Sequence, residues 1–163
     1  MSAQDSKLFV ISGPSGAGKG TLVTRVRERR SNLGLTVSAT TRAPRKGEVD
    51  GVNYFFLTRE EFDRRVANGE FVEWAEVHGN CYGTLVSEVQ SKLASGSSLI
   101  LEIDVQGALQ VKERFPEAVL IFIKPPSLEV LRERLVGRGT ETPETIELRM
   151  ANAAHELALA DRY

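Results

Sequence analysis

The stretch that most constrains the fold of this chain runs from Ile11 to Leu22 and reads ISGPSGAGKGTL. Four glycines and one lysine lie within residues 13–20, between the apolar run KLFVIS and a segment with apolar residues at helical spacing. A buried core disfavours glycine, and a plain surface loop has no need of this spacing. The pattern therefore predicts a strand, a loop whose backbone is approached closely by a ligand, and a helix.

The loop matches the pattern G-x-x-x-x-G-K, whose glycines let backbone N–H groups curl around an anion. The helix that follows adds its N-terminal dipole, and Lys19 adds a charge for the terminal phosphates of a nucleotide. A glycine-rich turn with an incidental lysine is the plainer alternative, but the flanking strand and helix favour phosphate binding. We expect the phosphate contacts along Gly13, Pro14, Ser15, Gly16, Ala17, Gly18, Lys19, Gly20 and Thr21.

The position after Lys19 holds Gly20, where the usual motif has serine or threonine, and the hydroxyl comes one residue later at Thr21. The contact of that hydroxyl with Mg²⁺ is therefore open. Mg²⁺ keeps several waters and is held readily by phosphates, so the metal needs few protein ligands.

The order of elements predicts an α/β fold. Buried strands are expected at residues 7–12, 97–104 and 118–123, and helices at 20–30, 85–94 and 107–115. Thr58, Ser127 and Thr142 are expected to cap three further helices. Residues 36–84 differ from the strand-then-helix order of the two ends of the chain, because this part has an extended segment at 35–42, a turn at 78–83 and exposed arginines. We expect one domain with a parallel core formed by residues 7–35 and 85–163 and a small inserted subdomain at 36–84.

Composition limits the class of function. The 163 residues suit one domain, and 21 basic against 22 acidic residues argue against a general binder of nucleic acid or membrane surfaces. With Cys81 as the single cysteine no internal disulfide can form, and His78 and His155 are isolated, which argues against a transition-metal site. No apolar run reaches the ~18 residues of a membrane span and no signal peptide is recognised, so we expect a cytoplasmic protein.

Two arginines, Arg42 and Arg45, lie three residues apart in the loop of the inserted segment. Loop arginines are usually solvated, but beside a phosphate-binding loop they become candidates for gripping a second phosphate, because a guanidinium binds phosphate bidentately. Tyr54 and Tyr82 could add hydroxyl donors.

Four segments, SATTRAPRKGEVDGVNYFF, FVEWAEVHGNCYGT, LEIDVQGA and GRGTET, together with the G-K-G-T loop, resemble the guanylate kinase family in family order over essentially the whole chain. The resemblance implies a three-layer core with a GMP-binding subdomain and a lid at about residues 137–146. It implies phosphoryl transfer from ATP to GMP, giving ADP and GDP, with Mg²⁺, in guanine nucleotide salvage and biosynthesis. No obligate protein partner is expected.

The resemblance also implies roles, position by position. The GMP phosphate would be held by Arg42, Arg45, Tyr54 and Tyr82, and the guanine by Ser38, Glu73, Thr84 and Asp104. ATP would be held by the loop together with Arg134 and Arg138 near the lid. The catalytic charges would be Lys19, Arg42, Arg138 and Arg149. Thr21 and Glu102 would approach the metal, largely through water.

Residue chemistry supports the guanine assignment independently, because N1–H and N2–H₂ of guanine need acceptors and ionised Glu73 and Asp104 supply them. A solvated glutamate and a helix cap are the plainer alternatives for these two residues, and Asp104 could serve as both cap and acceptor. Transfer itself needs positioning, charge and exclusion of water more than covalent help.

Two other functions are less consistent with the sequence. A non-catalytic guanylate kinase-like domain that binds phosphopeptides typically has a degraded phosphate loop, whereas Lys19 and the loop glycines are present here. A kinase for AMP or UMP is disfavoured by Glu73 and Asp104. Relatives also continue beyond the position of Tyr163 with another strand and a helix that carry part of the adenine contact, so the chain is expected to lack that part.

Overall fold

The computed structural model describes residues 6–14, 16–139 and 141–163. Its core is a parallel four-stranded sheet in the order β2-β7-β1-β8. The bounds are β1 at Leu8–Ser12, β2 at Leu33–Leu35, β7 at Ser98–Glu102 and β8 at Val119–Phe122. The carboxyl ends of parallel strands meet at one edge, so the loops after β1 and β7 lie next to each other.

Helices cover both faces of this sheet because side chains alternate along each strand. One face packs against α3 (Val86–Ala94) and α4 (Val105–Arg114) through Leu8, Val10, Leu99, Leu101, Val89, Ala108 and Val111. The other face packs against α1 (Lys19–Arg29) through Ile11, Ile100 and Val23. The predicted α/β fold with a three-layer parallel core is confirmed.

A second four-stranded sheet, in the order β4-β3-β6-β5, is formed by the chain between β2 and α3. Its strands are β3 (Ala39–Thr40), β4 (Phe55–Phe56), β5 (Phe71–Val77) and β6 (Asn80–Leu85), and α2 (Arg59–Ala67) packs on it. The rings of Phe62 and Phe71 stack at 4.4 Å between their centres, in a core that also buries Ala39, Cys81 and Leu85. This sheet therefore has a hydrophobic core of its own.

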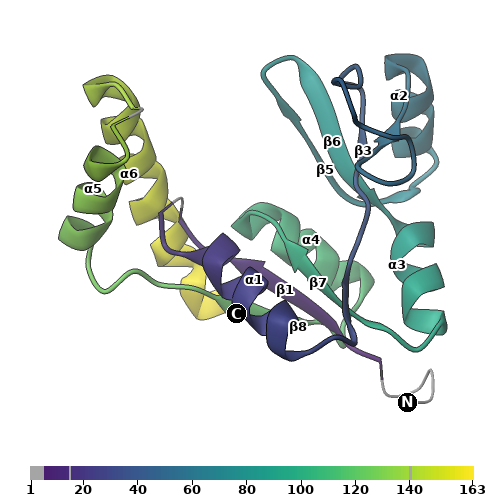
Figure 1. The fold of residues 1–163 in the computed structure, drawn as a ribbon, viewed down its shortest axis with the longest axis horizontal. Helices are drawn as coiled ribbons and strands as arrows, with labels where there is room; N and C mark the ends of the chain where they lie inside the picture. Colours follow the sequence, from purple (N-terminus) through teal and green to yellow (C-terminus); the bar gives the residue numbers. More distant parts are fainter. Residues whose placement is uncertain (1–5, 15, 140) are drawn as a thin grey trace.

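Helices α5 (Leu128–Gly137) and α6 (Pro143–Leu159) pair with each other through Leu131, Leu135, Ile146 and Ala153, and the 3₁₀ turn η2 (Ala160–Arg162) follows. Figure 1 shows this pair on one side of the core and the second sheet with α2 on the other. The two lie apart, above the core elements β1, α1 and α4.

Helix starts follow the expected caps. Thr58, Ser127 and Thr142 each accept a hydrogen bond from a backbone N–H in the first turn, and Pro143 occupies the first turn of α6. Asp104 does the same for α4 through the N–H of Gly107 at 2.7 Å.

Three local expectations were wrong. The stretch 78–83 turns only at His78 and Gly79, and residues 80–85 pair with β5, because tertiary pairing outweighs the local turn propensity of a Gly-rich sequence. The extended stretch 35–42 is divided between β2 and β3, which belong to different sheets. Strand β8 lies at the sheet edge, so Val119 and Ile121 are 38% and 37% exposed.

Among the described residues, no helix combines the length and the apolar composition required to cross a membrane.

Candidate functional site

The glycine loop joins the carboxyl end of β1 to the first residue of α1, as expected. Gly13 has no room for a side chain, because a Cβ there would lie 2.4 Å from the carbonyl oxygen of Ile123. Gly18, the N-cap of α1, has φ of 98°, a left-handed conformation that favours glycine. The first turn of α1 carries no acidic residue, so the positive end of the helix is not neutralised there. Ser15 lies outside the described residues.

Lys19 folds back over this loop. Its Nζ donates a hydrogen bond to the carbonyl oxygen of Gly13 at 2.7 Å. The ammonium also acts on Glu156 of α6, where burial raises the pKa of the carboxyl and Lys19 opposes that rise. The lysine charge is therefore held at the mouth of the loop, where a terminal phosphate would meet it.

A cavity of about 640 Å³ opens beside the loop. Arg134 reaches it from α5 and donates from Nη1 to the carbonyl oxygen of Gly16 at 3.2 Å. The lining residues are Gly16, Ala17, Gly18, Thr21, Leu22, Arg25, Ile123, Arg134 and Arg138. The structure thus brings the glycine loop, Thr21 and the two predicted arginines together.

Sequence reasoning missed Leu22, Arg25 and Ile123 as lining residues of this cavity. For Arg25 a signal existed, because it follows Thr21 by four residues and therefore shares its helix face. Arg149, predicted with the catalytic charges, does not appear among the described lining residues and pairs instead with Glu141 at 3.2 Å.

The second candidate site lies in the inserted sheet around Arg42. The Cζ of Arg42 lies 5.2 Å from the ring centre of Tyr54, and the ring of Tyr82 meets Tyr54 edge-on at 6.2 Å. The two tyrosine hydroxyls also approach the guanidinium closely enough to raise its pKa. Three of the four predicted phosphate ligands are therefore brought together.

Arg42 has a charged partner that sequence reasoning missed. Its guanidinium donates to both carboxylate oxygens of Glu48, at 2.9 and 3.0 Å. These bonds raise the pKa of Arg42, and together with the backbone N–H of Arg45 they lower the pKa of Glu48. The fourth predicted ligand, Arg45, reaches Glu48 through that N–H at 2.7 Å, and its residue is exposed.

Two carboxylates from different parts of the chain meet at the N-terminus of α4. Glu73 comes from β5, and Asp104 follows β7. A Cβ placed on Gly107 would lie 3.2 Å from Oδ1 of Asp104 and 3.5 Å from Oε2 of Glu73, so both oxygens border the same small volume. Burial raises the pKa of Glu73, and the nearby charge of Asp104 raises it further.

Thr84 is buried, with only 1% of its surface exposed, and its hydroxyl donates a hydrogen bond to Oε1 of Glu73 at 2.7 Å. This bond lowers the pKa of Glu73 against the effect of burial and fixes the carboxylate, leaving Oε2 toward Gly107. Ser38, the remaining residue of the predicted guanine set, is half-buried, and its carbonyl oxygen accepts from the N–H of Phe55 at 2.9 Å.

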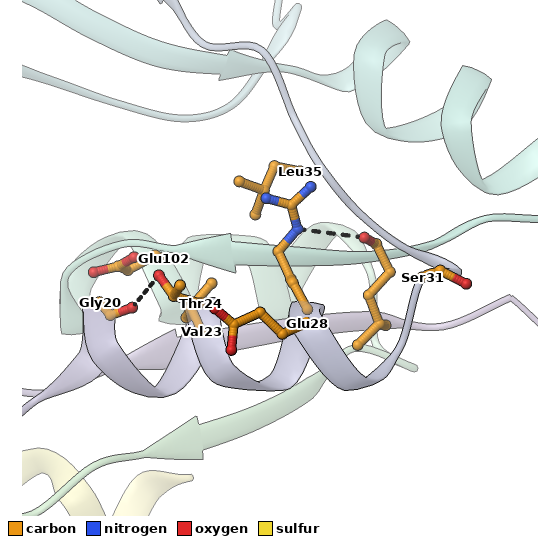
Figure 2. Close-up of a pocket in the computed structure, with 9 residues that line it drawn as sticks. Gly20, Val23, Thr24, Glu28, Ser31, Leu35 and Glu102 are labelled. Atoms are coloured by element: carbon orange, nitrogen blue, oxygen red, sulfur yellow. Dashed lines mark hydrogen bonds between the residues drawn. The ribbon is translucent and has the colours of Figure 1, made fainter.

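The two residues predicted near a metal line different cavities. Thr21 lines the cavity beside the loop, whereas Glu102 lines one of about 550 Å³ between α1 and β2. Figure 2 shows Glu102 and Gly20 at one end of that cavity and Ser31 at the other. Among the described residues no group of three or more histidine, cysteine, aspartate or glutamate side chains could hold a metal. A donor set this sparse fits Mg²⁺ carried by phosphates and water.

Comparison with known proteins gives one consistent family. The guanylate kinase family model matches residues 5–163. A guanylate kinase of Halalkalibacterium halodurans is 54% identical over 163 residues, covering 100% of this chain and 80% of the relative. One of Gloeobacter violaceus is 58% identical over 158 residues, covering 97% of this chain and 77% of the relative.

Structure comparison agrees. The crystal structure of guanylate kinase from Anaplasma phagocytophilum matches with a TM-score of 0.68 and 39% identity, covering 97% of this chain and 73% of that one. The chain belongs to the guanylate kinase family.

Proposed function

We propose that this protein transfers the terminal phosphoryl group of ATP to GMP, giving ADP and GDP. The observation that carries the proposal is the meeting of Glu73 and Asp104 at the N-terminus of α4, which suits the N1–H and N2–H₂ donors of guanine. The family supports it, since the relatives that this chain resembles are named guanylate kinase.

In the proposed reaction a phosphate oxygen of GMP attacks the terminal phosphorus of ATP in line. One oxygen–phosphorus bond forms, the bond to the ADP oxygen breaks, and no proton has to move, because the attacking oxygen is already anionic. The protein's task is to place the two nucleotides, neutralise charge and keep water out.

ATP would lie in the cavity beside the glycine loop, with Lys19, Arg134 and Arg138 around its phosphates. Mg²⁺, when bound, would neutralise and orient those phosphates. Thr21 and Glu102 would reach it from two sides of α1 through water. Arg149 would join only when α6 shifts, because its present partner is Glu141.

GMP would lie between the core and the second sheet. Arg42, Tyr54 and Tyr82 would hold its phosphate, with Arg45 swinging in from the exposed loop. Glu73 and Asp104 would accept from the base, with Thr84 and Ser38 at its rim. We extend the proposal to the cytoplasm, where both nucleotides are made and used.

The deciding experiment is turnover with ATP·Mg²⁺ and a panel of GMP, AMP and UMP, measured as ADP release and as the nucleoside diphosphate formed. GDP formation with a strong preference for GMP is expected. Equal rates on AMP would overturn the role of the two carboxylates. Binding of GMP or of a phosphopeptide without any turnover would overturn the enzyme in favour of a binding domain.

A further inference from the structure

The proposed phosphate site around Arg42 has a carboxylate beside it. Glu48 lies against the guanidinium, and the two side chains are only 14% and 19% exposed. Like charges repel, so a carboxylate beside a phosphate site is unfavourable unless its own charge is matched. The contacts of Glu48 show how it is matched.

Glu48 accepts three N–H groups, two from Arg42 and one from the backbone of Arg45. Its own N–H donates to the carbonyl oxygen of Arg45 at 3.0 Å, which closes the turn 45–48. The hydrogen bonds from Arg42 and then Arg45 lower the pKa of Glu48, so it stays ionised at neutral pH. The carboxylate is therefore part of the loop's structure.

The remaining donors of Arg42 are those that a phosphate needs. A guanidinium has five N–H bonds in one plane. Nη1 donates to Glu48 at 2.9 Å and to the carbonyl oxygen of Ala43 at 3.0 Å, and Nη2 donates to Glu48 at 3.0 Å. Apart from the hydroxyls of Tyr54 and Tyr82, which also approach the guanidinium, these contacts leave the Nε hydrogen and one Nη2 hydrogen, which lie along the same edge of the guanidinium. That pair can grip two oxygens of one phosphate.

We propose that Glu48 is a positioning residue for GMP: it holds the end of the Arg42 guanidinium so that the Nε–Nη2 side faces the GMP phosphate. This inference rests on the proposed function, because GMP is taken as the ligand. The Tyr54 ring lies against the same guanidinium, 5.2 Å from its Cζ, and limits how far the guanidinium plane can tilt. Glu48 then determines which edge of the guanidinium faces the phosphate.

The alternative role for Glu48 is that of a stand-in for phosphate that leaves when GMP arrives. Leaving would break both bonds from Arg42 and the bond from the Arg45 N–H, and only the backbone bond from the Glu48 N–H to the Arg45 carbonyl oxygen would still hold the turn 45–48. The positioning role keeps all three bonds. The two roles predict opposite changes in GMP affinity when the carboxylate is removed.

The test compares Glu48→Gln with Glu76→Gln in the full chain. The control removes the same charge from strand β5 of the second sheet, where Glu76 pairs with Arg59 at 3.2 Å. Losing a charge-assisted bond to Arg42 is expected to raise KM for GMP roughly 10-fold or more, with KM for ATP unchanged within about two-fold. The control should change neither. An unchanged or lowered KM for GMP in Glu48→Gln would overturn the proposal.

A double-mutant cycle separates positioning from direct contact. If Glu48 acts through Arg42, Glu48→Gln has little further effect on GMP binding in an Arg42→Lys background, and additive losses would overturn the proposal. GMP affinity should be measured by calorimetry without ATP. The Kd then tests Glu48 even if the protein binds GMP and fails to phosphorylate it, an outcome that would overturn the proposed function alone.

A nucleotide-free measurement adds a third readout. Rotation of the Arg42 guanidinium, followed by nitrogen NMR of its Nη groups, should be slow in the wild-type protein and in Glu76→Gln, and faster in Glu48→Gln. Equal rotation rates in all three proteins would show that Glu48 does not hold Arg42.

Discussion

At the scale of single residues, the charges of Lys19 and Arg42, which the proposed reaction uses, are held in place before any nucleotide binds. Lys19 is tied to the Gly13 carbonyl and Arg42 to Glu48, so neither long side chain has to be ordered from solution on binding. Preorganised charge of this kind lowers a transition-state barrier without reorganisation during the reaction.

Replacing Lys19 should therefore cost activity and leave the fold intact. Lys19→Met is expected to lower kcat/KM by several hundred-fold, the equivalent of about 3–4 kcal/mol for a lost transition-state charge. Lys92→Met, which removes a lysine on α3 paired with Glu88, is the control. Steady-state kinetics and thermal unfolding of both variants check this, and a Lys19→Met protein that keeps more than a tenth of the wild-type turnover contradicts it.

Glu73 should behave as a residue that serves binding at some cost in stability. Its folded-state pKa is raised, chiefly by burial, so the folded protein binds its proton more tightly than the unfolded chain does. The stability that this group contributes is thus present at low pH and is lost as pH rises through the raised pKa.

Glu73→Gln is accordingly expected to keep or raise the melting temperature at pH 7, with the difference from wild type shrinking as pH falls to the ordinary glutamate range. The same variant should lower kcat/KM for GMP roughly 10–100-fold, through one weakened charge-assisted bond, and affect AMP far less. Unfolding curves over pH and kinetics with both nucleotides test the two halves. Equal losses for GMP and AMP would assign Glu73 to the fold and not to the base.

At the scale of elements, the contact between the glycine loop and Ile123, the residue after β8, leaves the least room for a larger side chain. Gly13 meets the backbone of Ile123, which cannot move aside as a flexible side chain could. The position of the loop and that of the end of β8 therefore fix each other, although residues 13 and 123 are 110 residues apart in the sequence.

Gly13→Ala should lower the free energy of unfolding by about 2 kcal/mol or more, in the range of other steric insertions into packed sites, and remove ATP binding. Gly137→Ala is the matched substitution, because a Cβ there meets nothing within 4 Å, and it should be neutral or stabilising by up to ~1 kcal/mol. Denaturant unfolding of both variants gives the comparison. Equal stability of the two would mean that the loop shifts freely away from Ile123.

At the scale of the whole molecule, the α5–α6 pair and the second sheet with α2 form two arms that lie apart in Figure 1, and the proposed reaction requires these arms to approach each other. Arg149 pairs with Glu141 within the α5–α6 region and must turn toward ATP, and the Arg42 site must come within reach of the ATP phosphates. Each arm has its own hydrophobic core, so each can move as a unit.

Binding of both substrates should compact the molecule. Small-angle scattering is expected to show a smaller radius of gyration with GMP and a non-hydrolysable ATP analogue together than with either nucleotide alone. The same radius in all four states, including the free protein, would contradict closure.

How far sequence alone reaches depends on whether a feature is local. The glycine loop, the Thr58, Ser127 and Thr142 caps and the core strands β1, β7 and β8 follow from neighbouring residues and were predicted, whereas the short core strand β2 was not. Strands β3 and β4 have two residues each and exist through pairing with distant segments, so the sequence indicated only an extended stretch around β3 and did not mark the bounds of either strand. Glu48 was missed for a related reason, since a glutamate in a charged loop reveals its partner only when the turn is folded.

Under the proposed function Asp104 would have two roles with one carboxylate, which limits the substitutions that could change base preference. Its Oδ1 caps α4 through the Gly107 N–H, and it borders the same volume as Glu73. Most replacements would unravel the start of α4 while they alter base preference. Asparagine caps a helix about as well as aspartate and can offer an amide donor to a different base. Drift toward another nucleotide would therefore be expected to pass through Asp104→Asn, with α4 undisturbed.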